Sequence, residues 1–150
     1  MDTVYNGQSG PFMQTFKFLS YSFIFIIYHE EKSAKAMVES VDPLESILGK
    51  DLFLKEVKVI KTDRGSEFSD AEGLEKDNDG SMRTYVFYCD SMASCHKGSL
   101  ENNHKEVRYI CPKETNLKVL GFDSQKKANL MVSHINSRPK ENLKGKSPLE

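Results

Sequence analysis

The first 28 residues show the hydrophobic patterns that β-strands require. MDTVYNG at the start predicts the end of a strand followed by an Asn-Gly turn. Phe12, Phe16 and Phe18 alternate with polar neighbours, which predicts a half-exposed second strand. The apolar run FIFIIY at 23–28 predicts a strand buried on both faces. Residues 12–28 are too short and too polar for a membrane span, so we expect two strands around a turn near Ser20.

Helical patterns begin after residue 30 and then alternate with strands. EEKSAKAMVES at 30–40 has good helix formers with apolar residues every three to four positions, and LESILG predicts a second short helix from Pro43 to Gly49. VKVI at 57–60 and TYVFYC at 84–89 predict strands, joined by a polar connection with one helical turn. Helices are predicted over 98–111 and over 123–139, the second with an Asp-Ser cap.

These elements predict one α/β domain over residues 1–150. Three strands come first, and helices then alternate with two further strands, so we expect a mixed central sheet of about five strands flanked by helices. The composition, 38% hydrophobic and 29% charged, is that of a globular domain.

The charge is unevenly distributed, although the net charge is only −1. Residues 1–96 hold 10 Lys/Arg against 16 Asp/Glu, whereas residues 97–146 hold 11 against 5. A basic C-terminal third suits a polyanionic partner such as nucleic acid, and a solvated face is the alternative. The same alternatives apply to the basic tail of Arg138, Lys140, Lys144 and Lys146.

Cys89, Cys95 and Cys111 follow no small-domain disulfide pattern. With His96 and His104 they form C-x5-C-H-x7-H-x6-C, which lacks the short cysteine pair of a zinc site. Free, partly buried thiols in a reducing compartment are therefore the preferred interpretation.

The stretch KTDRGSEF at 61–68 places Asp63 where a predicted strand meets a glycine turn. A lone aspartate there is a turn residue, but Asp2 on the first strand and Glu101 in the first turn of the 98–111 helix could converge on it. Glu67 is interpreted as a surface turn acid, with support of such a site as the alternative.

Three converging carboxylates would hold Mg²⁺ beside a phosphate backbone. Mg²⁺ prefers oxygen ligands, and two such ions can assist an in-line displacement at phosphorus. Lys97, Lys105 and Arg108 lie at −4, +4 and +7 from Glu101, on the same side of the helix, as candidates for phosphate contact. Structural turn and cap acids remain the alternative.

The blocks TD-x-G-S-E-F, FYCD, KG-x-x-E-x-x-H and HIN, in this order, resemble the IS-thirty family of bacterial insertion-sequence transposases. The resemblance covers nearly the whole chain. It implies a ribonuclease-H-like fold and a DDE triad at Asp2, Asp63 and Glu101, using Mg²⁺ or Mn²⁺ to cut element ends and join them to target DNA. It also implies a cytoplasmic, DNA-associated protein of bacteria, which is compatible with a homo-oligomer and has no membrane contact.

Several positions depart from the family pattern. Arg64 stands where the family usually has Asn, and Cys95 and His96 replace a common Trp and Gln. The chain begins one residue before Asp2, so most of the first strand is expected to be missing, together with the N-terminal helix-turn-helix region. Two alternatives to an active transposase core therefore stay open. One is a catalytically inactive remnant that binds DNA through its basic third, and the other is a ribonuclease-H-type nuclease.

Overall fold

A computed structural model describes residues 1–5, 10–89 and 105–150, which fall into two compact units. We call residues 2–5, 10–31 and 105–150 the antiparallel unit, and Met1 with residues 32–89 the parallel unit. The described residues contain helices and five strands, in one antiparallel and one parallel sheet. The predicted α/β class and strand number are confirmed at this level, and the single domain stays a prediction.

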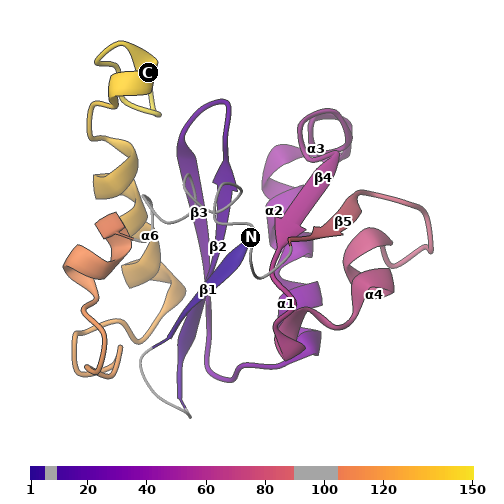
Figure 1. Cartoon of the computed structure of the whole chain (residues 1–150), viewed down its shortest axis with the longest axis horizontal. Helices are drawn as coiled ribbons and strands as arrows, with labels where there is room; N and C mark the ends of the chain where they lie inside the picture. Colours follow the sequence, from indigo (N-terminus) through magenta and orange to yellow (C-terminus); the bar gives the residue numbers. More distant parts are fainter. Residues whose placement is uncertain (6–9, 90–104) are drawn as a thin grey trace. The chain divides into compact units, whose positions relative to one another are not determined.

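The antiparallel unit contains the first three predicted strands (Figure 1). They are β1 (Asp2–Tyr5), β2 (Phe12–Phe18) and β3 (Phe23–His29), in the order β1-β2-β3. Asp2 is paired with Thr15, and Phe12 is paired with His29. The segment once considered as a membrane span is therefore a hairpin, with its turn between Phe18 and Phe23 as predicted.

Two burial predictions for this sheet need correction. We expected β2 to be half-exposed, but residues 12–16 are all buried, because β2 is the central strand. Gln14 and Thr15 are buried with its apolar residues. In β3, which we expected to be buried on both faces, Ile24 and Ile26 are buried but Phe23 and Phe25 are only half-buried.

The free edge of β3 is occupied by side chains of α6 (Gln125–Asn136). The Asn136 amide accepts a hydrogen bond from the Ile24 N–H (2.9 Å) and donates one to the Ile24 carbonyl (2.8 Å). Gln125, eleven residues earlier, accepts from the Tyr28 N–H and donates to the Ile26 carbonyl, both at 2.8 Å. Two amide side chains thus supply the bonds that a further strand would make.

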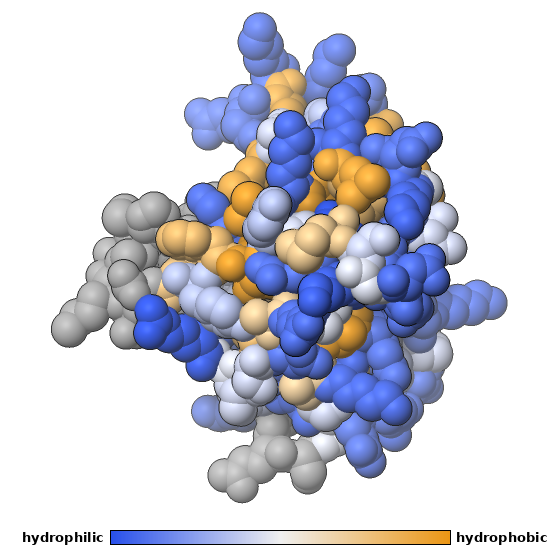
Figure 2. Space-filling view, turned by 90° about the vertical axis from the view of Figure 1, so that its right-hand side faces the viewer, coloured by the Kyte–Doolittle hydropathy of each residue, from blue (hydrophilic) through white to orange (hydrophobic). Residues whose placement is uncertain are grey.

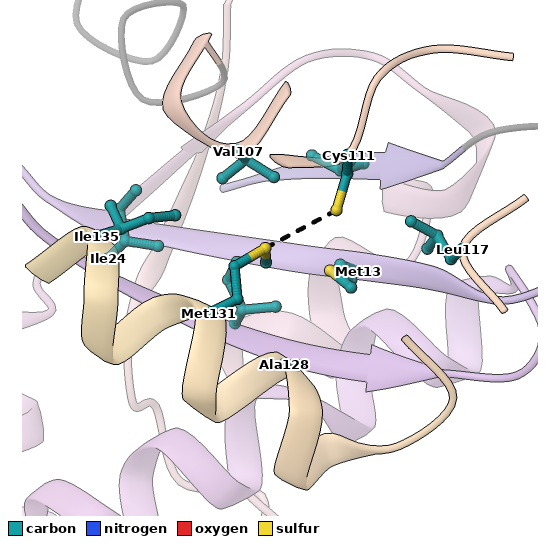
Figure 3. Close-up of a cluster of buried hydrophobic side chains, with 10 residues drawn as sticks. Met13, Ile24, Val107, Cys111, Leu117, Ala128, Met131 and Ile135 are labelled. Atoms are coloured by element: carbon teal, nitrogen blue, oxygen red, sulfur yellow. Dashed lines mark hydrogen bonds between the residues drawn. The ribbon is translucent and has the colours of Figure 1, made fainter. Parts of the chain in front are cut away.

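Side chains from the sheet, from α6 and from the segment between them form one hydrophobic cluster (Figure 3). Residues 105–110 are helical and contribute Val107, with Cys111 directly after them. The Cys111 Sγ lies 3.8 Å from the Met131 Sδ, between α6 and the sheet. Val107 and Cys111 are therefore on the buried face, as the predicted helix required. Leu100 and His104 lie outside the described residues.

The parallel unit begins with three short helices, of which two were predicted. They are α1 (Ala34–Glu39), α2 (Val41–Leu48) and α3 (Lys50–Glu56). The break between the first two falls at Ser40 and not at Pro43, because proline is tolerated in the first turn of a helix.

The rest of this unit is the predicted alternation of strand, connection and strand. The elements are β4 (Val59–Thr62), the short 3₁₀ turn η1 (Ser66–Phe68), α4 (Ala71–Glu75) and β5 (Tyr85–Tyr88). β4 and β5 pair in parallel, with Val59 opposite Tyr85. The connection forms the single helical turn that was predicted, as α4.

The buried side chain of Arg83 connects two helices of the parallel unit. Its guanidinium is almost fully buried and donates to the Asp42 carboxylate. It also donates to the carbonyls of Gly73 and Leu74, at 3.1 Å in both cases. Glu45 adds a second carboxylate at 3.5 Å. This arginine therefore ties α2 to the end of α4.

Among the described residues, one face of the β4–β5 sheet is buried and the other is largely exposed. Ile60 and Thr62 are buried, whereas Val59, Tyr85 and Phe87 are each more than half exposed. Figure 2 looks onto the side of the molecule that carries α3, α4 and β5, and it shows hydrophobic side chains among a mostly hydrophilic surface.

No helix within the described parts of the chain is long and apolar enough to cross a membrane.

Candidate functional site

Asp63 lies directly after the last residue of β4, at the strand tip where the sequence placed it. Its Oδ1 accepts a hydrogen bond of 3.0 Å from the Gly65 N–H, two residues along the chain. This is a local aspartate turn, and it holds the carboxylate in one orientation. The predicted turn is thus present and holds a carboxylate at the tip of a strand, and a role of Asp63 in metal binding stays a prediction.

Gly65 is required by close approach and not by its backbone angle, which is an ordinary φ of −58°. A Cβ at this position would lie 2.5 Å from the Glu67 Oε2 and 3.1 Å from the Asp63 Oδ1. The carboxylates of Asp63 and Glu67 therefore lie beside the same glycine. Any larger residue at position 65 would displace Glu67.

Glu67 is not the surface turn acid that the sequence suggested. Its side chain is only 10% exposed, and its Oε1 lies 2.7 Å from the Lys32 Nζ. The ion pair attaches the turn after β4 to the residues that precede α1. Glu67 thus helps to fix the turn that carries Asp63, and its support of a metal site stays a prediction.

Asp2 is held within the antiparallel unit by the pairing of β1 with β2. Its Oδ1 accepts from the Thr3 N–H at 2.7 Å, and its carbonyl accepts from the Thr15 hydroxyl at 3.1 Å. Pairing extends from Asp2 through Tyr5, so the short first strand is fully part of the sheet. Asp2 is therefore also a carboxylate oriented by a neighbouring N–H.

Arg108 lies close to β1, where its guanidinium donates to the Tyr5 carbonyl at 3.2 Å. Burial lowers the pKa of Arg108, and the charges of Cys111 and Asp2 raise it in part. Asp2 and Arg108, both predicted site residues, therefore interact within one unit. Lys105, three residues earlier on the same helical segment, is exposed.

The remaining predicted site residues are not placed together. Glu101 and Lys97 lie outside the described residues, and Asp63 belongs to a different unit from Asp2. In residues 1–5, 10–89 and 105–150, no group of three or more His, Cys, Asp or Glu side chains could hold a metal ion. Convergence of the three acids stays a prediction.

Two contacts near the candidate site had no signal in the sequence. Lys32 and Glu67 are separated by 35 positions, and nothing in the local pattern of either links them. The Met1 ammonium donates to the Lys61 carbonyl at 2.7 Å, across 60 positions. Both contacts join positions far apart in the sequence, so only a three-dimensional structure could show them.

The cysteines agree with the preferred interpretation as far as they are described. Cys89 and Cys111 are buried free thiols, and burial raises the pKa of Cys111 to about 11. A thiol with such a pKa is unreactive and is a poor metal ligand at neutral pH. Cys95 and His96 lie outside the described residues.

Comparison with known proteins gives no assignment: no protein-family model matches this chain, and no curated protein is significantly similar to it.

Proposed function

We propose that this chain is the core of a DDE-type DNA transposase, which cleaves DNA strands and joins them to a target. The observation that carries the proposal is the turn after β4. There Asp63 is fixed by the Gly65 N–H and is flanked by Glu67, which is paired with Lys32. An ordinary turn aspartate needs no ion pair beside it. A carboxylate that must hold its position during catalysis benefits from one.

The proposed fold is ribonuclease-H-like, with both sheets belonging to one mixed sheet. What supports this proposal is the content of the described residues, which hold helices and five strands in one antiparallel and one parallel sheet. Chemistry at the ends of adjacent strands is typical of open α/β sheets.

Asp2, Asp63 and Glu101 would hold Mg²⁺ or Mn²⁺, which would activate the attacking oxygen and stabilise the leaving oxygen. The donor set suits these ions, since all three ligands are carboxylates. Asp2 and Asp63 are each held by a backbone N–H within two residues, at 2.7 and 3.0 Å. Each of these two carboxylates is therefore already held in one orientation by its own turn or strand.

Basic side chains would position the DNA for this chemistry. Lys105 is exposed and suited to contact a phosphate as a point charge. Arg108 has a second task, because it already donates to the carbonyl of Tyr5 on β1. We propose that Arg108 links the strand of Asp2 to the bound backbone.

A second candidate function is DNA binding without catalysis. The departure that favours it is Arg64, an exposed cation next to Asp63 where the resembling family usually has asparagine. A cation beside a metal ligand weakens binding of a divalent ion.

Calorimetric titration with Mg²⁺ and Mn²⁺ separates the two functions. For the strand-transfer core, we expect binding to the native chain and a loss of affinity of at least about tenfold in Asp2→Asn, Asp63→Asn and Glu101→Gln. Asp51→Asn is the matched control, because it removes an exposed aspartate from the first turn of α3 in the parallel unit.

Equal affinity of all four variants would mean that the three acids do not share an ion, and would leave the non-catalytic function. With binding established, the same variants should abolish cleavage of DNA that carries element ends.

A further inference from the structure

Glu75, the last residue of α4, occupies the outer edge of β5. The Tyr85 N–H donates to the Lys58 carbonyl, so the backbone groups of Tyr85 point toward β4. Those of Val86, the next residue, point to the other side, where the Val86 N–H donates to the Glu75 Oε1 at 2.9 Å. In the part of the chain that the structure describes, no further strand pairs with β5 on that side.

The main chain of Glu75 is fixed beside the start of β5. Its carbonyl accepts from the Arg83 N–H at 2.8 Å and from the Thr84 N–H at 3.4 Å. The edge beside Thr84 is therefore occupied by backbone, whereas the Val86 N–H is bonded by a side chain. Rotation of the Glu75 side chain would open the edge from Val86 onward.

This closure is less complete than that of the β3 edge. There the Gln125 amide accepts from one backbone N–H and donates to a backbone carbonyl. A carboxylate can only accept, so Glu75 supplies nothing to the Val86 carbonyl, which points to the same side as the Val86 N–H. Within the described residues, one hydrogen bond to a side chain thus closes this part of β5.

The sequence of β5 lacks the features that usually prevent strands from pairing at an exposed edge. Its residues, YVFY, include no charge and no proline. Tyr85 is 63% exposed and Phe87 is 52% exposed, on the open face of the sheet. Two strands alone make a marginal sheet, and three or more with a hydrophobic face are needed for stability. A further strand at this edge would therefore stabilise the parallel unit.

We propose that the edge of β5 is a self-association surface, at which β5 of a second copy of this chain pairs in the antiparallel direction. The second strand displaces the Glu75 carboxylate from the Val86 N–H. Because the edge beside Thr84 is already occupied, pairing begins at Val86, and the centre of the twofold arrangement falls at Phe87. Val86 of each copy then exchanges both backbone hydrogen bonds with Tyr88 of the other.

The side chains of β5 fit a second copy better than an unrelated peptide. In this register the two Phe87 rings lie opposite each other at a non-hydrogen-bonded pair, and each Tyr85 ring is a diagonal neighbour of the other Phe87. The strand has no charge that its own copy would repel. The surface is thus complementary to itself, as a twofold dimer requires, and pairing extends the sheet from two strands to four. None of these residues belongs to the proposed metal or DNA site, so self-association is independent of the proposed strand-transfer function.

Two variants of Glu75, made in the full chain, separate the hydrogen bond from the charge. Glu75→Asp keeps the charge, but its shorter side chain no longer reaches the Val86 N–H. Glu75→Gln removes the charge and keeps an acceptor for that N–H, with a donor for the Val86 carbonyl in addition. Glu72→Gln removes the same charge from an exposed position of α4 and is the matched control. Sedimentation velocity over a range of protein concentrations measures dimerisation.

We expect the dimer dissociation constant of Glu75→Asp to be about tenfold lower than that of the native chain, because no carboxylate competes for the Val86 N–H. Glu75→Gln should associate no more strongly than the native chain, and Glu72→Gln should match it to within about twofold. Equal dimerisation of Glu75→Asp and the native chain, including none in either, would overturn the proposal. Strong association of both Glu75 variants would also overturn it, since the loss of the hydrogen bond and not of the charge is proposed to open the edge.

Two further substitutions, each added to Glu75→Asp, test where the copies meet. Phe87→Lys places two lysines opposite each other at the centre of the proposed pairing, so dimerisation should be lost. Val59→Lys adds the same charge to the same exposed face, but on β4 and away from the edge, and should change the dissociation constant by less than about threefold. Dimerisation that persists in the Phe87→Lys variant, or that is lost equally in both, would place the contact on another surface and overturn the proposal.

Discussion

The two sheets of this chain are completed in different ways. In the antiparallel unit, the amides of Gln125 and Asn136 occupy the open edge of β3, and neutral hydrogen bonds finish the sheet. In the parallel unit, β4 and β5 have one covered face and one exposed face, and a buried arginine ties the surrounding helices together. The antiparallel unit thus has its β3 edge hydrogen-bonded, whereas the described residues of the parallel unit leave one face of the β4–β5 pair exposed.

The difference shows that antiparallel and parallel sheets need different contacts to be stable in a small unit. An antiparallel sheet can have one solvated face, so sealing its edge is enough. Parallel sheets are normally covered on both sides, and two parallel strands supply little stability alone. The parallel unit therefore depends on its helices, and on Arg83 between them.

Among the substitutions that test this comparison, replacing Arg83 should lower the free energy of unfolding most. Arg83→Met removes the guanidinium that pairs with Asp42 and Glu45, and it leaves the carbonyls of Gly73 and Leu74 without this donor. We expect the free energy of unfolding to fall by about 3 kcal/mol, as when one partner of a buried ion pair is removed. Urea unfolding followed by circular dichroism measures this loss.

Lys35→Gln is the control in the same unit. It breaks the exposed pair of Lys35 and Glu39, whose side chains are 83% and 59% exposed, and exposed pairs contribute less than about 1 kcal/mol. Similar losses in the two variants would show that Arg83 does not tie the helices as described.

Removing the Asn136 amide from the edge of β3 should cause the next largest loss in the free energy of unfolding. Asn136→Ala leaves the N–H and carbonyl of Ile24 without their partner, in a place where Asn136 is only 1% exposed. The expected cost is about 2 kcal/mol, together with faster hydrogen exchange at the Ile24 amide. The opened edge should also make association depend on protein concentration.

Lys126→Ala also truncates a side chain of the same helix to alanine, at an exposed position, and should leave both properties near native. Hydrogen exchange at Ile24 that is unchanged in Asn136→Ala would show that the amide does not complete the sheet.

The smallest effect is expected at the exposed face of the parallel pair. Val59→Ser should change the free energy of unfolding by less than about 1 kcal/mol, because Val59 is 51% exposed. Ile60→Ser, one position along on the buried face, should cost about 3 kcal/mol. A large loss in Val59→Ser, measured by thermal unfolding, would mean that this face is covered in solution.

The strands were predictable because each carries its own pattern. FIFIIY and TYVFYC are apolar runs bounded by turn residues, and both form strands within a residue or two of the predicted limits. Helix α3 was missed because Leu52 and Leu54 are exposed and only Phe53 is buried. Residues 50–56 therefore have no hydrophobic residues at helical spacing from which the helix could be predicted.

The candidate site was predictable only in its local part. A strand followed by an aspartate and a glycine predicted the turn at Asp63, and the structure contains it. The burial of Glu67 was not predictable, because it depends on Lys32, far along the chain. The role of Asn136 was hidden for the same reason, since its partner Ile24 is 112 positions away.

The same separation delays the pairing of β3 with α6 during synthesis, because Asn136 is made long after Ile24. Synthesis proceeds at about 5–20 residues per second, so the 112 residues between Ile24 and Asn136 take on the order of 6–20 seconds. During that interval the strand FIFIIY is already outside the ribosome, but the backbone N–H and carbonyl groups that α6 later bonds are still unpaired. Exposed apolar strands of this kind readily pair with strands of other chains. The hairpin is thus most exposed to aggregation when newly made, and chaperones that bind extended apolar segments would have their main task there.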